Sequence, residues 1–213
     1  MNGNRGSCSS DGNTPLGEAP PSGLDAAFLD KLRAIVGTEN VQTDSYNRVL
    51  RSYGKLQEET VGLKRGMLHE ITGAVVHPRD KAEVQQLVAL CDEARIPLYV
   101  YGGGSSVNKG FLPEREGITL VLSTHLNKVL ELNELNQTCR VEAGCLGPQL
   151  EDALNRAPEL FGAAHRFTQG HFPQSFEIST VGGWFATMGS GQASTYYGDA
   201  ADLVVAAEMI SPA

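Results

Sequence analysis

Long hydrophobic runs are missing from this chain of 213 residues. No stretch of about 18 apolar residues occurs, which is the length that a membrane-spanning helix needs. The N-terminus also lacks the charged-then-apolar pattern of a signal peptide. Positive charge is scarce: the formal net charge of −8 argues against a general nucleic-acid binder, which needs a basic face. We therefore expect neither a transmembrane segment nor a nucleic-acid partner.

Cysteine is sparse and shows no spacing typical of a metal site. No Cys-x-x-Cys pair occurs, and the histidines show no His-Glu-x-x-His pattern. We therefore expect no metal site, and free thiols in a reducing, cytoplasmic compartment. The cysteines are Cys8, Cys91, Cys139 and Cys145.

Several familiar functional motifs are also absent. No Gly-Lys-Ser/Thr occurs, which excludes a P-loop, and no Gly-x-Ser-x-Gly elbow indicates a serine hydrolase. The run from Gly102 ends in Val107 where the Rossmann fingerprint needs its third glycine, and the residues that follow are poor helix formers. The common nucleotide-binding classes therefore do not fit.

Glycine is abundant, and its most informative run follows a short apolar stretch, residues 97–100, that predicts a buried strand. In the run Tyr101-Gly102-Gly103-Gly104-Ser105-Ser106, three consecutive glycines leave one turn without Cβ atoms, so successive backbone N–H groups can point at an anion. Two serines add hydroxyl donors. A phosphate or pyrophosphate suits such a loop, and an ordinary glycine-rich turn is the alternative.

The remaining pattern predicts a disordered tail over residues 1–23, and then an N-terminal helix with an irregular arm over residues 24–70. An α/β or α+β domain follows over residues 71–213. Its expected strands are 74–76, 96–101, 118–122, 128–132, 138–142 and 203–210. Its expected helices are 80–94, 147–155 and 179–187, the last beginning at a Ser or Thr cap.

A second cluster of glycines and hydroxyls extends from Gly170 to Gly191 and carries few charges. Such donors suit a cofactor with many polar edges, whereas a tightly packed helix with a glycine-rich entry is the alternative. His171 within it is a weak candidate for acid–base catalysis. A structural histidine that shapes the Gly-His-x-Pro turn is the favoured interpretation, and the catalytic residues remain unknown.

These two clusters, with Tyr197-Gly198 and Asp202 to Val205, carry a resemblance. Residues from about 71 to 211 resemble the FAD-binding domain of the FAD-linked oxidases, the PCMH-type fold of the vanillyl-alcohol oxidase superfamily. Within it, the chain looks most like the alkyldihydroxyacetonephosphate synthase branch and its bacterial relatives. The resemblance implies an α+β fold of two subdomains that hold FAD between them.

The resemblance also implies roles for matched residues. The loop 100–106 would wrap the FAD pyrophosphate, residues 174–180 would contact the flavin side, and residues 186–190 would complete the cradle. Because the loop contains no histidine or cysteine, we expect FAD to be bound non-covalently. The implied cofactor-binding residues are Val100, Tyr101, Gly102, Gly103, Gly104, Ser105, Ser106, Gln174, Ser175, Ser179, Thr180, Gly183, Ala186, Thr187 and Ser190.

The chain departs from the family pattern in three ways. Gln174 stands where many relatives have aspartate. Met188 stands where the synthase branch usually has arginine, which removes a charge-assisted contact. The chain also stops near the end of the second subdomain, so the domain is expected to be incomplete, with catalytic residues beyond Ala213.

Two functions stay open. One is the FAD-binding part of an FAD-dependent oxidoreductase or alkylglycerone-phosphate synthase-like enzyme, inactive alone, which in its intact form takes a small-molecule substrate. The other is a truncated, non-catalytic nucleotide-binding or structural module. A homodimer is also left open.

Overall fold

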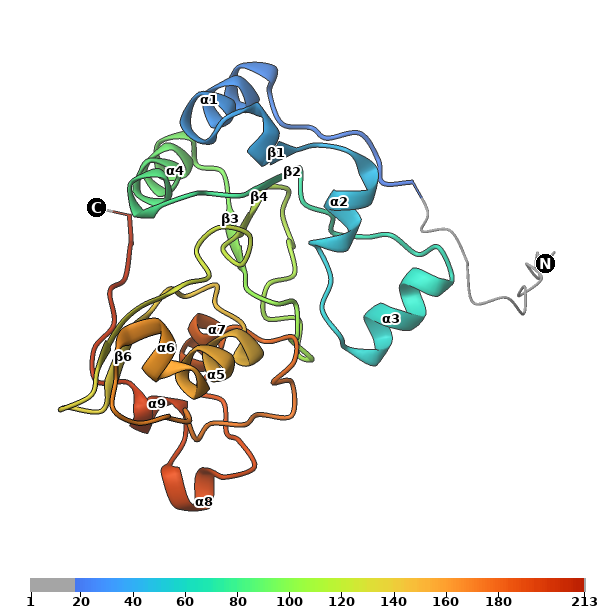
Figure 1. The fold of residues 1–213 in the computed structure, drawn as a ribbon. Helices are drawn as coiled ribbons and strands as arrows, with labels where there is room; N and C mark the ends of the chain where they lie inside the picture. The colour runs from blue at the N-terminus through green and yellow to red at the C-terminus, as the bar shows by residue number, and fades with distance from the viewer. Residues whose placement is uncertain (1–17, 213) are drawn as a thin grey trace.

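The structure, a computed structural model, describes residues 18–212, which fold into two α+β subdomains (Figure 1). The expectation of an α+β chain with two subdomains is confirmed. Its elements are α1 (Ala26–Val36), η1 (Thr38–Asn40), β1 (Val41–Gln42), α2 (Ser45–Leu50), α3 (Gln57–Lys64), β2 (Ala74–Val76), α4 (Lys81–Ala94), β3 (Leu98–Tyr101), β4 (Ile118–Val121), β5 (Val129–Asn133), β6 (Thr138–Val141), α5 (Gly147–Asn155), α6 (Ala157–Phe161), α7 (Val181–Thr187), α8 (Ser194–Tyr197) and α9 (Ala200–Leu203).

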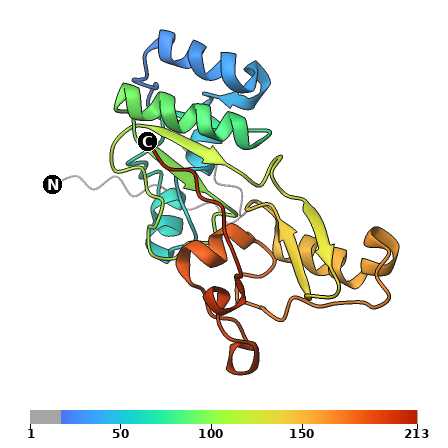
Figure 2. The same ribbon diagram turned by 90° about the vertical axis from the view of Figure 1, so that its left-hand side faces the viewer.

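The first subdomain is built on a four-stranded sheet with the strand order β1-β2-β4-β3. Strand β1 is antiparallel to β2, whereas β2, β4 and β3 are parallel to one another. Helices α1 and α4 lie side by side on one face of this sheet (Figure 2). Because side chains alternate along a strand, that face receives Ala74, Val76, Ile118 and Leu120, which pack with Leu32 and Leu87 of the helices.

The second subdomain pairs β5 and β6 in an antiparallel hairpin, as the alternating sequence predicts. Helices α5 and α7 pack with it around a second core, in which Leu150, Leu154 and the single tryptophan, Trp184, are buried. The helices predicted over residues 80–94, 147–155 and 179–187 are all present, with Asp80 and Thr180 as N-caps.

We predicted an irregular arm over residues 38–70, and this prediction is wrong. The arm contains two helices, α2 and α3. Helix α2 has only six residues, too few for a clear period, and its start depends on Asp44, which accepts a hydrogen bond from the Asn47 backbone N–H at 3.0 Å. Its buried residues, Arg48 and Val49, hold it against the sheet. Tertiary contacts rather than periodicity therefore produce this helix.

The strand predicted over residues 203–210 is also wrong. Residues 200–203 form α9, and residues 204–212 form no helix or strand and have no ladder partner in the described part of the chain. A strand needs a neighbouring strand to satisfy its backbone, and this apolar run has none here. Ile210 instead packs against the first core.

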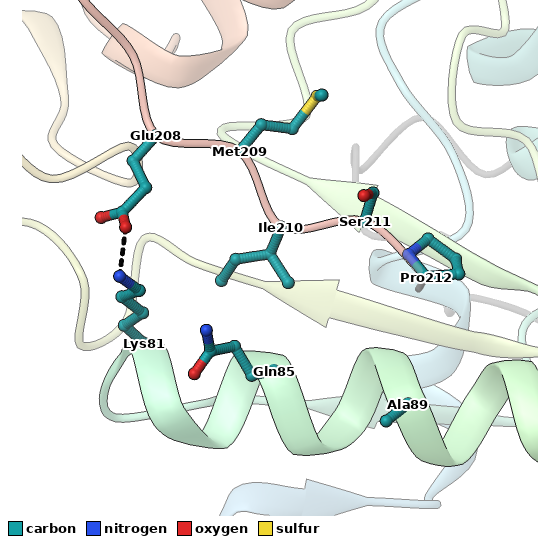
Figure 3. A pocket seen from close by; sticks show the side chains of 8 residues that line it. All are labelled: Lys81, Gln85, Ala89, Glu208, Met209, Ile210, Ser211 and Pro212. Carbon is teal, nitrogen blue, oxygen red and sulfur yellow. Dashed lines mark hydrogen bonds and ion pairs between the residues drawn. The ribbon is translucent and has the colours of Figure 1, made fainter.

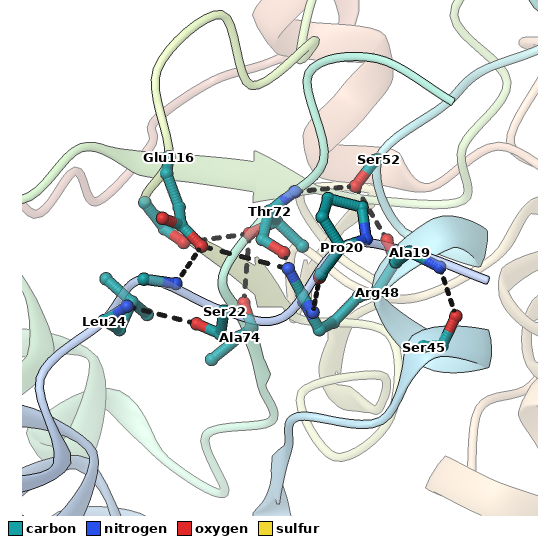
Figure 4. Close-up of polar contacts among 12 residues, drawn as sticks. Ala19, Pro20, Ser22, Leu24, Ser45, Arg48, Ser52, Thr72, Ala74 and Glu116 are labelled. Atoms are coloured by element: carbon teal, nitrogen blue, oxygen red, sulfur yellow. Dashed lines mark hydrogen bonds and ion pairs between the residues drawn. The ribbon is translucent and has the colours of Figure 1, made fainter. Parts of the chain in front are cut away.

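The described part of the predicted disordered tail, residues 18–23, contains no helix or strand but is fixed to the domain (Figure 4). The Ala19 backbone N–H donates to the Ser45 hydroxyl, and the Gly23 N–H donates to the Glu116 carboxylate at 2.9 Å. Residues 1–17 lie outside the described residues. No helix among the described residues is long and apolar enough to cross a membrane.

Candidate functional site

The glycine loop lies at the carboxyl edge of the three parallel strands. Gly102 follows the last residue of β3, His77 follows β2, and Leu122 follows β4 and donates its backbone N–H to Tyr101. Ligands of open parallel sheets bind at this edge, where the strands end and the loops are free to vary. The topology therefore places the predicted anion loop where a ligand is expected.

The loop offers a row of unused donors. The backbone N–H groups of residues 102–107 donate no hydrogen bond to any acceptor in the part of the chain that the structure describes. Gly104 adopts a left-handed conformation with φ of +71°, which a glycine accommodates without strain. Residues 102–106 are buried or half-buried, whereas Val107 is exposed. Since N–H groups in such places are normally paired, the row over residues 102–106 fits a phosphate group, which accepts several hydrogen bonds at once.

The loop is in contact with the second glycine cluster. A Cβ at Gly103 would overlap the backbone carbonyl of Ile178, and one at Gly102 would overlap the Thr180 hydroxyl. The two segments, far apart in the sequence, thus meet at the boundary between the two subdomains. The absence of side chains at Gly102 and Gly103 is therefore required for the contact between the two segments, as well as for the approach of a ligand.

The hydroxyls of Ser179 and Thr180 are used within the protein. Ser179 is buried, accepts from the Trp184 indole N–H at 2.5 Å and donates to the Ser175 carbonyl at 2.8 Å. Thr180 is buried too and caps α7 by accepting from the Gly183 N–H at 3.3 Å. In this arrangement both side chains position α7 and the loop.

The other predicted cofactor-binding residues are more accessible. Gln174, Ala186, Thr187 and Ser190 are exposed, and Ser105, Ser106, Ser175 and Gly183 are half-buried. Val100 lies in β3, opposite Leu120 of β4. Because side chains alternate along a strand, its side chain lies on the other face of the sheet from that of Tyr101. Met188, at the departure from the family pattern, ends α7 with φ of +49° and is 67% exposed.

His171 is a packed histidine. Its side chain is 3% exposed, and neither ring nitrogen has a hydrogen-bond partner among the described residues. Its ring meets the Trp184 ring edge-on, with 5.0 Å between the centroids. Burial lowers the pKa of His171, although Asp199 acts in the opposite direction, so the neutral ring is favoured. This geometry agrees with a structural histidine.

Two residues near the loop were not predicted as site residues. His77 is buried and bonded at both nitrogens, to the Thr124 hydroxyl at 2.7 Å and the Gln42 side chain at 3.1 Å. The Arg51 guanidinium lies over the Tyr101 ring, with 4.9 Å between Cζ and the ring centroid. The sequence Arg51-Ser52-Tyr53-Gly54 stands out within the arm, but no motif links it to a ligand.

Two hollows elsewhere on the surface do not involve the loop. One, of about 330 Å³, lies between α4 and the C-terminal segment, where Lys81 pairs with Glu208 (Figure 3). The other, of about 370 Å³, is lined by residues of the second subdomain such as Val129 and Phe161. Within residues 18–212 no three His, Cys, Asp or Glu side chains gather as a metal site requires.

Comparisons with known proteins agree with this geometry. A family model described as an FAD binding domain matches residues 72–213. An alkyldihydroxyacetonephosphate synthase of Trypanosoma brucei brucei is 27% identical over 197 residues, 91% of this chain and 31% of the relative. A glycolate oxidase subunit of Bacillus subtilis is 26% identical, over 85% of this chain and 35% of the relative.

A solved structure of an alkyldihydroxyacetonephosphate synthase superposes with a TM-score of 0.80 at 28% identity. It is covered over 36% of its length, and this chain over 90%. The chain thus spans about a third of the relatives that it matches. Its fold, its glycine loop and the matched family model show that the chain belongs to the FAD-binding domain family of the FAD-linked oxidases.

Proposed function

We propose that the chain binds FAD non-covalently between its two subdomains, with the pyrophosphate against residues 102–106 and the flavin side against residues 174–180. The row of unused N–H groups at residues 102–107 is the observation that carries this proposal. The loop's contact with Ile178 and Thr180 supports it, because one ligand can then touch both segments. Exposed Ala186, Thr187 and Ser190 would complete the FAD-binding surface, which we call the cradle and which comprises residues 102–106, 174–180 and 186–190.

Non-covalent binding is supported by the absence of a nucleophile from the glycine loop and by the burial of two cysteines and of His171. Residues 100–106 contain no histidine or cysteine. Burial raises the pKa of Cys91 and Cys145 to about 11, so these thiols stay protonated at neutral pH. His171 is enclosed against Trp184.

The binding test is a titration of the purified chain with FAD, followed by flavin fluorescence. We expect saturable binding, flavin that stays with the protein on desalting, and release of the flavin into the supernatant on acid precipitation. A chain that stays colourless with excess FAD would contradict cofactor binding. Flavin that remains in the acid pellet would contradict the non-covalent mode alone.

We propose further that the chain is the cofactor-binding part of an enzyme. The relatives suggest either oxidation of a 2-hydroxy acid or alcohol, or an alkyl transfer of the synthase type. Bound FAD supplies the redox or electrophilic chemistry in both branches. The residues of this chain bind and orient FAD, and we expect no turnover from the chain alone.

The oxidase and synthase reactions can be distinguished by the absorption spectrum of the flavin. Bleaching of the oxidised-flavin absorption by a 2-hydroxy acid, in an FAD-loaded protein that includes this chain, would support the oxidase branch. Alkyl exchange without bleaching would support the synthase branch.

A non-catalytic nucleotide-binding or structural module is the second candidate, and Met188 favours it. This side chain is 67% exposed and carries no charge at a position where the synthase branch usually has arginine. Weak FAD binding that is restored by Met188→Arg, with neither bleaching nor exchange, would support this candidate.

Location and assembly belong to the same proposal. Cys91, Cys139 and Cys145 are free thiols, which supports a reducing, cytoplasmic compartment. A homodimer is a further prediction, which light scattering of the purified chain would check.

A further inference from the structure

Arg51 has a buried donor with nothing to bind. It follows α2, and its Nε is buried without a hydrogen-bond partner in the described part of the chain. No carboxylate among residues 18–212 forms an ion pair with its guanidinium. The Tyr101 ring, 4.9 Å from Cζ, is the neighbour that interacts with its charge.

Arg48, three residues earlier, shows how this fold satisfies a buried guanidinium. Its Nε donates to the Thr72 carbonyl at 2.7 Å, and one terminal nitrogen donates to the Pro20 carbonyl at 2.8 Å. Its other terminal nitrogen lies 3.8 Å from the Glu116 carboxylate. Arginine stays charged at every physiological pH. Arg51 is only partly buried, but its Nε is buried, and a buried donor without an acceptor costs free energy. The contrast indicates that Arg51 is arranged for an acceptor that the chain does not supply.

The position of Arg51 points to the glycine loop. A Cβ at Gly104 would overlap the Tyr101 hydroxyl, so the ring that carries Arg51 on its face lies directly against the loop. On the same arm, the Lys55 N–H donates to the Ser106 carbonyl at 2.7 Å. The guanidinium and the free N–H groups of residues 102–107 therefore border the same carboxyl edge of the sheet.

A phosphate is the ligand that these donors share. The guanidinium is a planar fork that matches two phosphate oxygens, and backbone N–H groups bind the remaining oxygens. We propose that Arg51 is the cationic contact for the pyrophosphate of FAD, held in place by Tyr101. This inference rests on the proposed FAD binding, and it supplies the charge that backbone donors alone do not provide.

The first experiment compares flavins that differ in phosphate. Wild-type chain, Arg51→Gln and the control Arg95→Gln are titrated with FAD and with riboflavin, which lacks phosphate. Arg95 is exposed and precedes β3, at the opposite edge of the sheet from the loop. We expect Arg51→Gln to weaken FAD binding roughly 10- to 100-fold and to reduce its salt dependence, because a charge-assisted bond is lost. Riboflavin binding and the control should be unchanged.

The outcomes separate the two claims. If the wild-type chain binds no FAD, the proposed function fails. If it binds FAD and Arg51→Gln binds FAD equally well, or loses riboflavin to the same extent, the role of Arg51 is overturned. Circular dichroism of each variant verifies that it is folded.

A second measurement needs no disruptive variant. In the wild-type chain, the Nε–H resonance of Arg51, assigned by its loss in Arg51→Lys, is followed by ¹⁵N NMR while ADP is added. ADP carries the pyrophosphate without the flavin. We expect a downfield shift at Arg51 and none at Arg95. A resonance that does not move when ADP saturates the protein would overturn the proposal.

Discussion

The contact between the glycine loop and Ile178 depends on the absence of a side chain at Gly103. The Gly103 backbone is so close to Ile178 that a Cβ there would overlap a backbone carbonyl, which cannot move away as a flexible side chain can. We therefore expect Gly103→Ala to destabilise the chain by about 2–3 kcal/mol, as overpacking does, and to abolish FAD binding. Urea unfolding and an FAD titration measure the two effects.

Gly62 is the matched control. It lies within α3, and a Cβ there meets atoms at ordinary contact distance, the nearest 3.8 Å away. Because alanine favours a helix over glycine, we expect Gly62→Ala to stabilise the chain by about 0.5–1 kcal/mol. Equal losses at both positions would contradict the contact between the loop and Ile178.

His77 makes stability depend on pH. Burial lowers its pKa to about 4, with further lowering from Arg51 and His125, whereas an unfolded histidine titrates near 6.5. Between these values the unfolded chain binds more protons, so the free energy of unfolding falls as the pH falls from about 6.5 to 4. We expect His77 to contribute about 2–3 kcal/mol of this loss.

His77→Gln isolates that contribution. The variant is less stable at pH 7, because the bond to Thr124 is lost, but it lacks the proton uptake. The difference in stability between wild type and variant, measured by urea unfolding, should therefore shrink towards pH 4. A difference that is constant from pH 7 to pH 4 would argue against a neutral, buried His77.

The roles of some individual residues could be predicted from the sequence, and those of others could not. Consecutive glycines have one common physical meaning, close backbone approach, so the loop could be predicted. Ser179 stays a predicted cofactor contact, and nothing in the sequence indicated that its hydroxyl also bonds Trp184 and Ser175. Arg51 was not predicted as a site residue: the run Arg51-Ser52-Tyr53-Gly54 is distinctive, but no motif assigns it a ligand.

Among the elements, α2 depends most on one side chain. Arg48 joins this helix to the start of β2, to Pro20 and to Glu116 (Figure 4). Its removal leaves the carbonyl of the buried Thr72 without this donor, so we expect Arg48→Met to cost about 1–3 kcal/mol in urea unfolding. Arg156→Met, on an arginine that is half exposed with surface partners, should cost far less, because surface ion pairs contribute little. Similar costs for both would contradict a structural role of the Arg48 network.

Elements with a long period or a local cap were predictable, and those made by tertiary contacts were not. Helix α4 combines an Asp80 cap with a continuous apolar face, and the sequence alone indicates it. Helix α2 was missed although Asp44 caps it, because its six residues show no period, and α3 was missed because its few apolar residues show no sustained period. The strand expected over 203–210 was wrong because apolar residues do not form a strand without a partner.

The whole molecule should respond to FAD as one unit. Trp184 reports on the second subdomain, whereas far-UV circular dichroism reports on both. If FAD touches both subdomains, FAD at 100 times its Kd should raise the free energy of unfolding by about 2.7 kcal/mol with both probes alike. A shift seen by only one probe would show that FAD stabilises one subdomain alone.

The contact between Gly103 and Ile178 also has a consequence for how the chain folds. The two residues are separated by much of the sequence, including both strands of the hairpin and α5. Bringing distant segments together costs chain entropy before any contact compensates for it, so such contacts form late and slow the reaction. The cradle would then be among the last parts to assemble, and a refolding chain would acquire flavin affinity only after most of its helix content has returned.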